Sequence, residues 1–316
     1  MSKVFAIAVN TFREAVRNRI LYIILIFAIL LLVFSGVLKN FTISDDQRQI
    51  QNFGIGAINL FGVMIAIFIG ITLIYNELEK KTIYTIVSKP IDRGHFLLGK
   101  YFGLLMTIYV NVLIMTLFFV IALHWQNLTS FDAMQSYLWV GDGKGGLSLR
   151  MPVSVFYVWT AIRSVAFGVG TFLGLYTPSF AVNIMATTWM TCLELAIITA
   201  FACMYSSFST PTLSAFFTVF TVICGRLSVE LFYFAQMLAQ KAGGFDKLLP
   251  SQKTWYNMAV GAFLVIPNLG LFNRRDTVIY PGAGWDMVLF TIGYAIAYSA
   301  AVLSLSILIF RRRNFK

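Results

Sequence analysis

Long apolar runs without charged residues recur along this chain, and short charged stretches separate them. The run Ile20–Leu38 contains 19 residues, and a helix rising ~1.5 Å per residue would make it about 28 Å long. Runs of this kind are typical of transmembrane helices, because ~20 apolar residues cross the hydrocarbon core of a bilayer. The pattern predicts six spans, at about residues 20–38, 54–75, 101–123, 184–205, 211–228 and 286–310.

The composition agrees with this pattern. Hydrophobic residues make up 59% of the chain and charged residues 12%, whereas soluble domains carry ~25% charged residues. The sequence therefore predicts an all-α polytopic membrane protein in which residues 1–316 form a single domain.

Basic residues gather in three short segments, 1–19, 76–100 and 311–316, which hold 13 of the 24 lysines and arginines. Short loops rich in Lys and Arg stay in the cytoplasm, so we expect these segments and both chain ends to be cytoplasmic. An even number of spans must then separate them. Residues 153–177 are apolar but contain Arg163, and a seventh span there would place the C-terminal arginines outside. We therefore predict an interfacial or re-entrant helix on the outer face.

Two outer segments remain, 124–183 and 229–285. The first contains the glycine-rich stretch Gly141–Gly146, which lacks the spacing of a phosphate-binding loop and predicts a plain turn. The second contains two apolar stretches too short to span, 231–238 and 258–266. We expect short helices that dip into the outer leaflet.

The charged segment 76–100 has a helical pattern of its own. Glu77 and Lys81 are spaced i,i+4 in the favourable order. The apolar residues that follow share one helical face, namely Ile83, Tyr84, Ile86 and Val87. Pro90 disfavours helix at the residue before it, and Asp92 can cap a helix that leads into the next span. The segment therefore predicts a short amphipathic helix at the membrane surface, which a soluble partner could bind.

The first 19 residues predict an amphipathic helix at the membrane interface. One stripe of this helix is apolar and consists of Val4, Phe5, Ala8, Phe12, Ala15 and Val16. Basic residues such as Arg13 and Arg17 cover the rest, where they would contact lipid headgroups. The same helix could simply lead into the first span with snorkelling side chains, or its arginines could face a soluble partner.

Few ionisable residues lie within the predicted spans. Glu194 is in the middle of the fourth span, where a charge costs ~2.5–3.5 kcal/mol on insertion scales and so faces the protein interior. It could contact a substrate or a proton, or it could form a helix–helix hydrogen bond with Thr188 or Thr191. Arg226 and Glu230 are spaced i,i+4 near the outer end of the fifth span, and we expect them to pair with each other.

Several kinds of chemistry are not supported by the sequence. The net charge of +11 is explained by the basic loops, and no module with basic and aromatic residues for nucleic acid is evident. The two histidines and three cysteines lack metal-ligand spacing. No Walker A motif is present. We therefore expect no metal or cofactor on this chain and no enzymatic activity, including no hydrolysis of ATP by this chain alone.

Four segments carry a resemblance through their order along the chain. They are FREAVRNRI at 12–20, the loop from Glu77 to Lys100, SSFS at 206–209 and IPNLGLFN at 266–273. Together they resemble the permease (transmembrane) subunits of type-2 ATP-binding-cassette (ABC) exporters. One departure is Lys81, because the family often has a glycine there in an E-x-x-x-G-T pattern.

The resemblance implies an assembly of two permeases, formed with a second copy or a paralogue, and a dimer of cytoplasmic ATPase chains that bind ATP and Mg²⁺. The segment 76–100 would be a coupling helix that contacts the ATPase. The implied contact residues are Glu77, Lys81, Thr82, Ile83, Tyr84, Val87, Ser88, Pro90 and Arg93. The assembly would lie in the bacterial cytoplasmic (inner) membrane and move its substrate out of the cytoplasm or the inner leaflet.

Two other functions remain open. An ion-coupled secondary transporter would use Glu194 as a proton site, although no internal repeat of the expected kind is evident. A non-transporting membrane scaffold would use 124–183 as its working surface. Aromatic residues within the spans would suit a lipidic or amphipathic cargo, although ordinary packing explains them equally well; they are Tyr109, Trp189, Phe217 and Phe220.

Overall fold

The computed structural model describes residues 3–38, 46–79, 93–128, 139–141, 147–149, 153–175, 179–241, 245, 249–273 and 288–312. Nearly all of this described part is helical. Its α-helices are α1 (Lys3–Val16), α2 (Arg19–Leu38), α3 (Asp46–Glu79), α5 (Arg93–Leu128), α7 (Val153–Phe172), α8 (Ser179–Ser206), α9 (Pro211–Lys241), α10 (Pro250–Val265) and α12 (Val288–Arg312). The remaining elements are the 3-10 helix η3 (Leu269–Phe272) and the strands β1 (Trp139–Gly141) and β2 (Leu147–Leu149).

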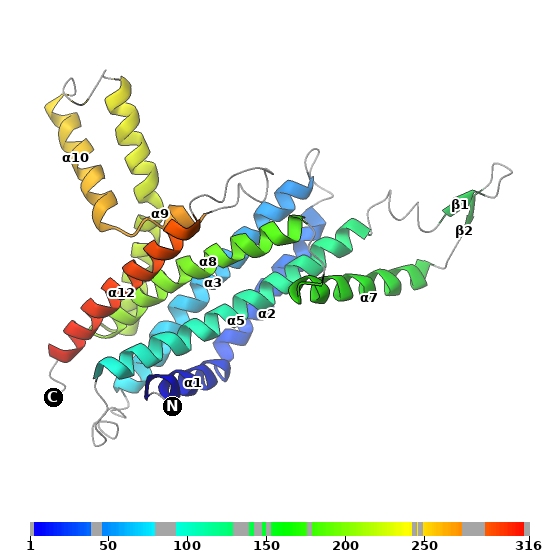
Figure 1. The fold of residues 1–316 in the computed structure, drawn as a ribbon, viewed down its shortest axis with the longest axis horizontal. Helices are drawn as coiled ribbons and strands as arrows, with labels where there is room; N and C mark the ends of the chain where they lie inside the picture. Colours follow the sequence, from blue (N-terminus) through cyan, green and yellow to red (C-terminus); the bar gives the residue numbers. More distant parts are fainter. Residues whose placement is uncertain are drawn as a thin grey trace.

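Helix α8 lies at the centre of a helical bundle and packs against α3, α5, α9 and α12 (Figure 1). Its second half is buried on every side, including Leu195, Ile197 and Cys203. A helix enclosed in this way has no polar face. The outer helices α2, α9 and α12 instead expose many large apolar side chains, which is the surface that a membrane covers.

The expected all-α polytopic membrane fold is confirmed. Within the described residues, six helices are long and apolar enough to cross a membrane, namely α3, α5, α7, α8, α9 and α12. The number rises to seven if α1 and α2, which meet at a 64° bend, form one broken span. The bend has a local cause, since the Asn18 side chain accepts a hydrogen bond from the Ile20 amide at 3.0 Å and so caps α2.

The positions of the helix ends agree with the even number of spans that the charge pattern predicts between the basic segments. Both termini, the ends of α3 and α5 that flank residues 80–92, and the turn between α8 and α9 lie at the same end of the bundle (Figure 1). We call this the terminal end. Helix α5 finishes and α8 starts at the opposite end, so α7 does not carry the chain across the bundle. By length and composition α7 could cross a membrane, and its interfacial position stays a prediction.

Helix α7 packs on the last turns of α5, where the Phe167 ring stacks on the His124 ring with centroids 3.8 Å apart. In the sequence between α5 and α7, strands β1 and β2 pair antiparallel, with Trp139 opposite Leu149. The predicted turn falls mainly on residues 142–146, which lie outside the described residues.

One expectation for the outer segments is wrong. Residues 231–238 do not form a separate short helix, because α9 continues without a break from Pro211 to Lys241. No glycine or proline interrupts it after Gly225. Helix α10 begins with Pro250 and returns along the outer part of α9, where the rings of Phe232 and Phe263 stack at 4.4 Å. Together α9 and α10 form a hairpin that stands away from the bundle (Figure 1).

Helix α1 packs closely along the first turns of α5. Its buried residues are Ala8, Thr11 and Ala15, so the contact face is rotated from the predicted stripe. Phe5 is 52% exposed and does not join it. Phe12 is half-buried, and Arg13 and Arg17 are exposed, as expected of residues that meet headgroups or a partner.

Replacing Gly103 by leucine should separate α1 from α5. A Cβ at this position would lie 2.5 Å from the Ala8 carbonyl oxygen and 2.6 Å from Thr11 Cβ, so the backbone of α1 would have to move. We expect the free energy of unfolding to fall by about 1–3 kcal/mol, as overpacked cores do, in denaturant unfolding of the purified chain. Gly293→Leu in α12 is the matched control, because a Cβ there meets no atom within 4 Å. Equal losses at both positions would contradict this packing.

Candidate functional site

Three polar side chains from three different helices meet inside the bundle, and we call them the polar cluster: Asn59 of α3, Glu194 of α8 and Arg226 of α9. The Arg226 Nη2 donates to Glu194 Oε1 at 2.9 Å, and its Nε donates to the same oxygen at 3.3 Å. The Asn59 amide donates to Glu194 Oε2 at 2.6 Å, and its carbonyl oxygen accepts from Arg226 Nη2. Each of the three residues therefore contacts both of the others.

The polar cluster lies at membrane depth. Glu194 is 12 residues from the end of α8 at Ser206, and Arg226 is 15 residues from the start of α9 at Pro211. At ~1.5 Å per residue these positions are roughly 18 and 22 Å from the terminal end. A hydrocarbon core is ~30 Å thick. The ion pair therefore lies where an unpaired charge would be costly.

The polar cluster corrects two expectations. Glu194 bonds to neither Thr188 nor Thr191, whose hydroxyls instead donate to carbonyl oxygens within α8. Arg226 pairs with Glu194 rather than with Glu230, which is exposed. The Glu194 side chain is only 3% exposed, and a buried carboxylate without a cation would be strongly destabilising. The stabilisation that Arg226 gives the buried Glu194 carboxylate outweighs the small gain from an exposed i,i+4 pair with Glu230.

Burial across the polar cluster is uneven. The Arg226 side chain is 42% exposed, in contrast to Glu194. Arg226 lies at the edge of a set of exposed apolar residues that share one side of α9, which we call the open face: Phe216, Val219, Phe220, Ile223, Leu227, Leu231 and Phe234. The guanidinium thus reaches inward to Glu194 and remains accessible from outside the chain. Asn59 is not singled out by the sequence pattern, although it is the polar residue within an otherwise apolar stretch of α3.

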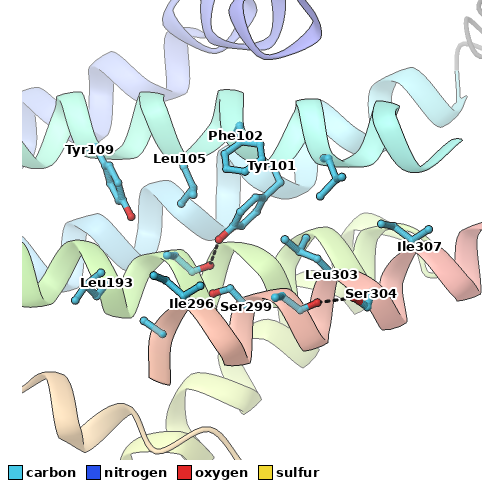
Figure 2. Close-up of a pocket in the computed structure, with 14 residues that line it drawn as sticks. Tyr101, Phe102, Leu105, Tyr109, Leu193, Ile296, Ser299, Leu303, Ser304 and Ile307 are labelled. Atoms are coloured by element: carbon cyan, nitrogen blue, oxygen red, sulfur yellow. Dashed lines mark hydrogen bonds between the residues drawn. The ribbon is translucent and has the colours of Figure 1, made fainter. Parts of the chain in front are cut away.

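A hollow of about 430 Å³ lies between α5, α8 and α12 (Figure 2). Its wall is mostly apolar, including Leu105 and Leu303. The Tyr101 hydroxyl reaches across from α5 and donates to the Ala196 carbonyl oxygen of α8 at 3.2 Å. Tyr109, predicted as a possible cargo contact, also lines this hollow. Such a wall suits an apolar chain better than a charged group.

The aromatic residues named as cargo contacts are placed differently from one another. Phe220 and Trp189 are exposed large side chains. The Phe217 ring instead lies against the Tyr205 ring, with centroids 5.5 Å apart. Only Phe220 belongs to the open face of α9. No cluster of three or more His, Cys, Asp or Glu that could hold a metal occurs among the described residues.

A family model described as ABC-2 family transporter protein matches residues 5–315 of the chain. The chain belongs to this family. It is a membrane permease subunit of an ABC-2 type transporter, which confirms the resemblance. A comparison with curated proteins finds no match.

Two of the predicted coupling residues of this ABC-2 permease are described, and both lie at the terminal end. Glu77 is in the last turn of α3 and Arg93 is the first residue of α5. The other predicted contacts, which lie outside the described residues, are Lys81, Thr82, Ile83, Tyr84, Val87, Ser88 and Pro90. Their roles stay predictions.

The start of α5 is tied to α1 by a further ion pair in the permease. Lys100, two turns into α5, is 1% exposed, and its Nζ lies 3.4 Å from Glu14 Oε2 of α1. At the preceding residue, a Cβ on Gly99 would meet Ile7 Cβ at 2.6 Å. Small residues that let helices approach closely are typical of membrane packing. Helices α1 and α5 are thus joined at the C-terminal end of the predicted coupling segment.

Proposed function

We propose that this permease works in an ATP-driven exporter, in which two permease chains and two cytoplasmic ATPase chains move an amphipathic or lipidic cargo out of the cytoplasm or the inner leaflet. ATP and Mg²⁺ would bind to the ATPases. The terminal end of the bundle would face the cytoplasm of a bacterial cell, since it carries the basic segments that stay inside.

The observation that carries this proposal is the tie between α1 and α5. Residues 76–100 would receive the movement of the ATPases. Lys100 and Gly99 lie at the end of that segment and contact Glu14 and Ile7 of α1. A displacement of the coupling segment would therefore move α1 and α5 together, rather than bend one loop. Packed helices transmit such displacements because their cores deform little.

The polar cluster supports a pathway beside α9. Charged residues within a membrane span face the interior of the bundle or a water-filled cavity. Arg226 is anchored to the interior and is also exposed along the open face of α9. In the assembly this face would lie against the second permease or a pathway between the two chains.

The same geometry weighs against an ion-coupled carrier. A proton site would need a carboxylate that exchanges its proton freely, whereas Glu194 accepts from both Arg226 and Asn59. Family membership likewise favours a transport subunit over a scaffold.

Lys100→Met tests the proposed coupling. Methionine keeps an unbranched apolar side chain but removes the ion pair with Glu14. We expect ATP hydrolysis to continue, while the fraction of permease that changes conformation on nucleotide trapping falls about tenfold, equal to ~1.4 kcal/mol of coupling. The measurement is the distance between spin labels on Arg13→Cys and Leu227→Cys in the reconstituted assembly, on a background without the native cysteines.

The exposed Lys241→Met, at the far end of α9, is the control and should respond as the wild type does. Identical label distances with and without nucleotide in the wild type would contradict ATP-driven action. An unchanged response in Lys100→Met would show that coupling bypasses the α1–α5 tie.

A further inference from the structure

The exposed side of α9 carries two opposite charges that are not paired with each other. Arg226 is turned toward Glu194 and Asn59. Glu230, one turn farther from the terminal end, is exposed and makes no ion pair within the described part of the chain. An i,i+4 pair of opposite sign would ordinarily associate. Here the polar cluster keeps the two groups apart.

Arg226 has N–H groups that the polar cluster does not use. A guanidinium has five N–H groups, of which the polar cluster uses those of Nε and Nη2. The two N–H groups of Nη1 have no acceptor among the residues that the structure describes. Because the side chain is 42% exposed, an oxyanion outside the chain can approach them. Phosphate and carboxylate oxygens are the usual partners of such donors.

Glu230 belongs to a hollow of about 510 Å³ on the same side of α9. The hollow is lined by Leu227, Glu230, Leu231, Tyr233, Phe234 and Met237. A carboxylate beside exposed tyrosine and phenylalanine rings is suited to an ammonium group, which gains both the opposite charge and cation–π attraction. Its volume is within the ~300–1,000 Å³ of small-molecule sites.

The two groups are spaced for one headgroup. Side chains at i and i+4 have Cβ atoms ~5–6 Å apart, a distance that a phosphodiester joined to an ammonium by two carbons can bridge. Moving outward along α9, apolar residues such as Phe220 and Ile223 come first, then Arg226, then Glu230. In a zwitterionic lipid of the outer leaflet, the acyl chain, the anionic phosphate and the cationic ammonium follow one another in the same outward order.

We infer that the open face of α9 binds a zwitterionic amphiphile, whose anionic oxygen contacts Arg226, whose ammonium contacts Glu230, and whose apolar chain lies toward Phe220. The inference rests on the proposed function and names the class of its cargo. A purely anionic amphiphile would be repelled by Glu230. A neutral one would leave that carboxylate without a counter-charge.

The test is binding of fluorescent amphiphiles to the full permease–ATPase complex in maltoside micelles, followed by anisotropy. The probes share one acyl chain and differ in the headgroup: lysophosphatidylethanolamine is zwitterionic, lysophosphatidic acid is anionic and monoacylglycerol is neutral. We expect the wild type to bind the zwitterionic probe about tenfold more tightly than either other probe, the size of one favourable charge contact. Glu230→Gln should reduce the preference over the anionic probe to within about twofold.

Arg226→Lys keeps the charge but loses the planar donor fork, and it should weaken both phosphate-bearing probes while leaving the neutral probe unchanged. Gln236→Ala, an exposed change on the other side of α9, is the matched control and should bind as the wild type does. Equal binding of all three probes by the wild type, or an unchanged preference in Glu230→Gln, would overturn the inference.

A third outcome would also overturn it. If Glu230→Gln separates the two permeases, measured as a loss of mass of the complex, then Glu230 pairs with the second copy rather than with cargo. The binding assay needs no ATP hydrolysis. Failure of the ATPase to co-purify would therefore contradict the proposed function, whereas an intact complex without headgroup preference would contradict only this inference.

Discussion

Arg226→Leu is expected to lower the free energy of unfolding of the permease by about 3–5 kcal/mol, the usual cost of removing one partner of a buried ion pair. The reason is the carboxylate left behind. Glu194 is 3% exposed, and without Arg226 only the Asn59 amide would still donate to it. The measurement is denaturant unfolding of the purified chain in micelles.

A second substitution should reverse part of this loss. In the double variant Glu194→Leu/Arg226→Leu no charge remains in the polar cluster, and replacing a buried ion pair by apolar residues is often close to neutral. We expect the double variant to be more stable than Arg226→Leu alone. If the losses of unfolding free energy in the two single variants simply add up to the loss in the double variant, the result would contradict direct coupling of the two residues. Arg17→Leu, at an exposed arginine in the turn that follows α1, is the control and should change stability little.

Ile83→Asp/Tyr84→Asp should abolish co-purification of the permease with its ATPase. Burying an apolar side chain of this size contributes about 1.5–3 kcal/mol. Two lost contacts therefore weaken the complex by at least roughly 3 kcal/mol, or about 100-fold in Kd. Two added carboxylates in a buried contact would weaken it further. The measurement is the amount of ATPase recovered with tagged permease, followed by titration of the permease with ATPase to obtain the Kd.

The control for this variant is Thr85→Asp, which adds a charge on the opposite side of the predicted amphipathic helix. It should leave the complex intact. A complex of normal affinity in Ile83→Asp/Tyr84→Asp would show that the ATPase binds elsewhere on the permease. Equal losses in both variants would indicate a general effect of charge rather than an apolar contact face.

Five of the six predicted spans were predictable because each is an apolar run long enough to cross a bilayer, whereas the first, at 20–38, passes as a span only when α1 and α2 are taken together as one bent pair. The distribution of basic residues likewise indicated which helix ends lie together, since 13 of the 24 lysines and arginines occur in three short segments that an even number of spans must separate. The continuation of α9 to Lys241 was missed because the fifth span was ended at residue 228, where Arg226 and Glu230 interrupt the apolar run. Hydropathy marks where a helix leaves the membrane and does not mark where the helix ends.

The partners within the polar cluster could not be read from the sequence. Glu194 is separated from Asn59 by 135 residues and from Arg226 by 32. Local spacing offered Arg226 a nearer carboxylate at Glu230. Choosing between the two requires knowing that Glu194 is buried, which depends on how α3, α8 and α9 pack. The close approach of α1 to Gly103 was missed for the same reason, since a glycine in an apolar run does not reveal what lies against it.

The pairing of Glu194 with Arg226 also bears on how the chain enters the membrane. Glu194 precedes Arg226 by 32 residues, so α8 emerges from the ribosome before α9, which carries the cation that pairs with its carboxylate. Only residues 207–210 separate α8 from α9. The two helices can therefore enter the bilayer as one hairpin whose opposite charges cancel. The order of insertion, as well as the finished fold, would then depend on the short turn between them.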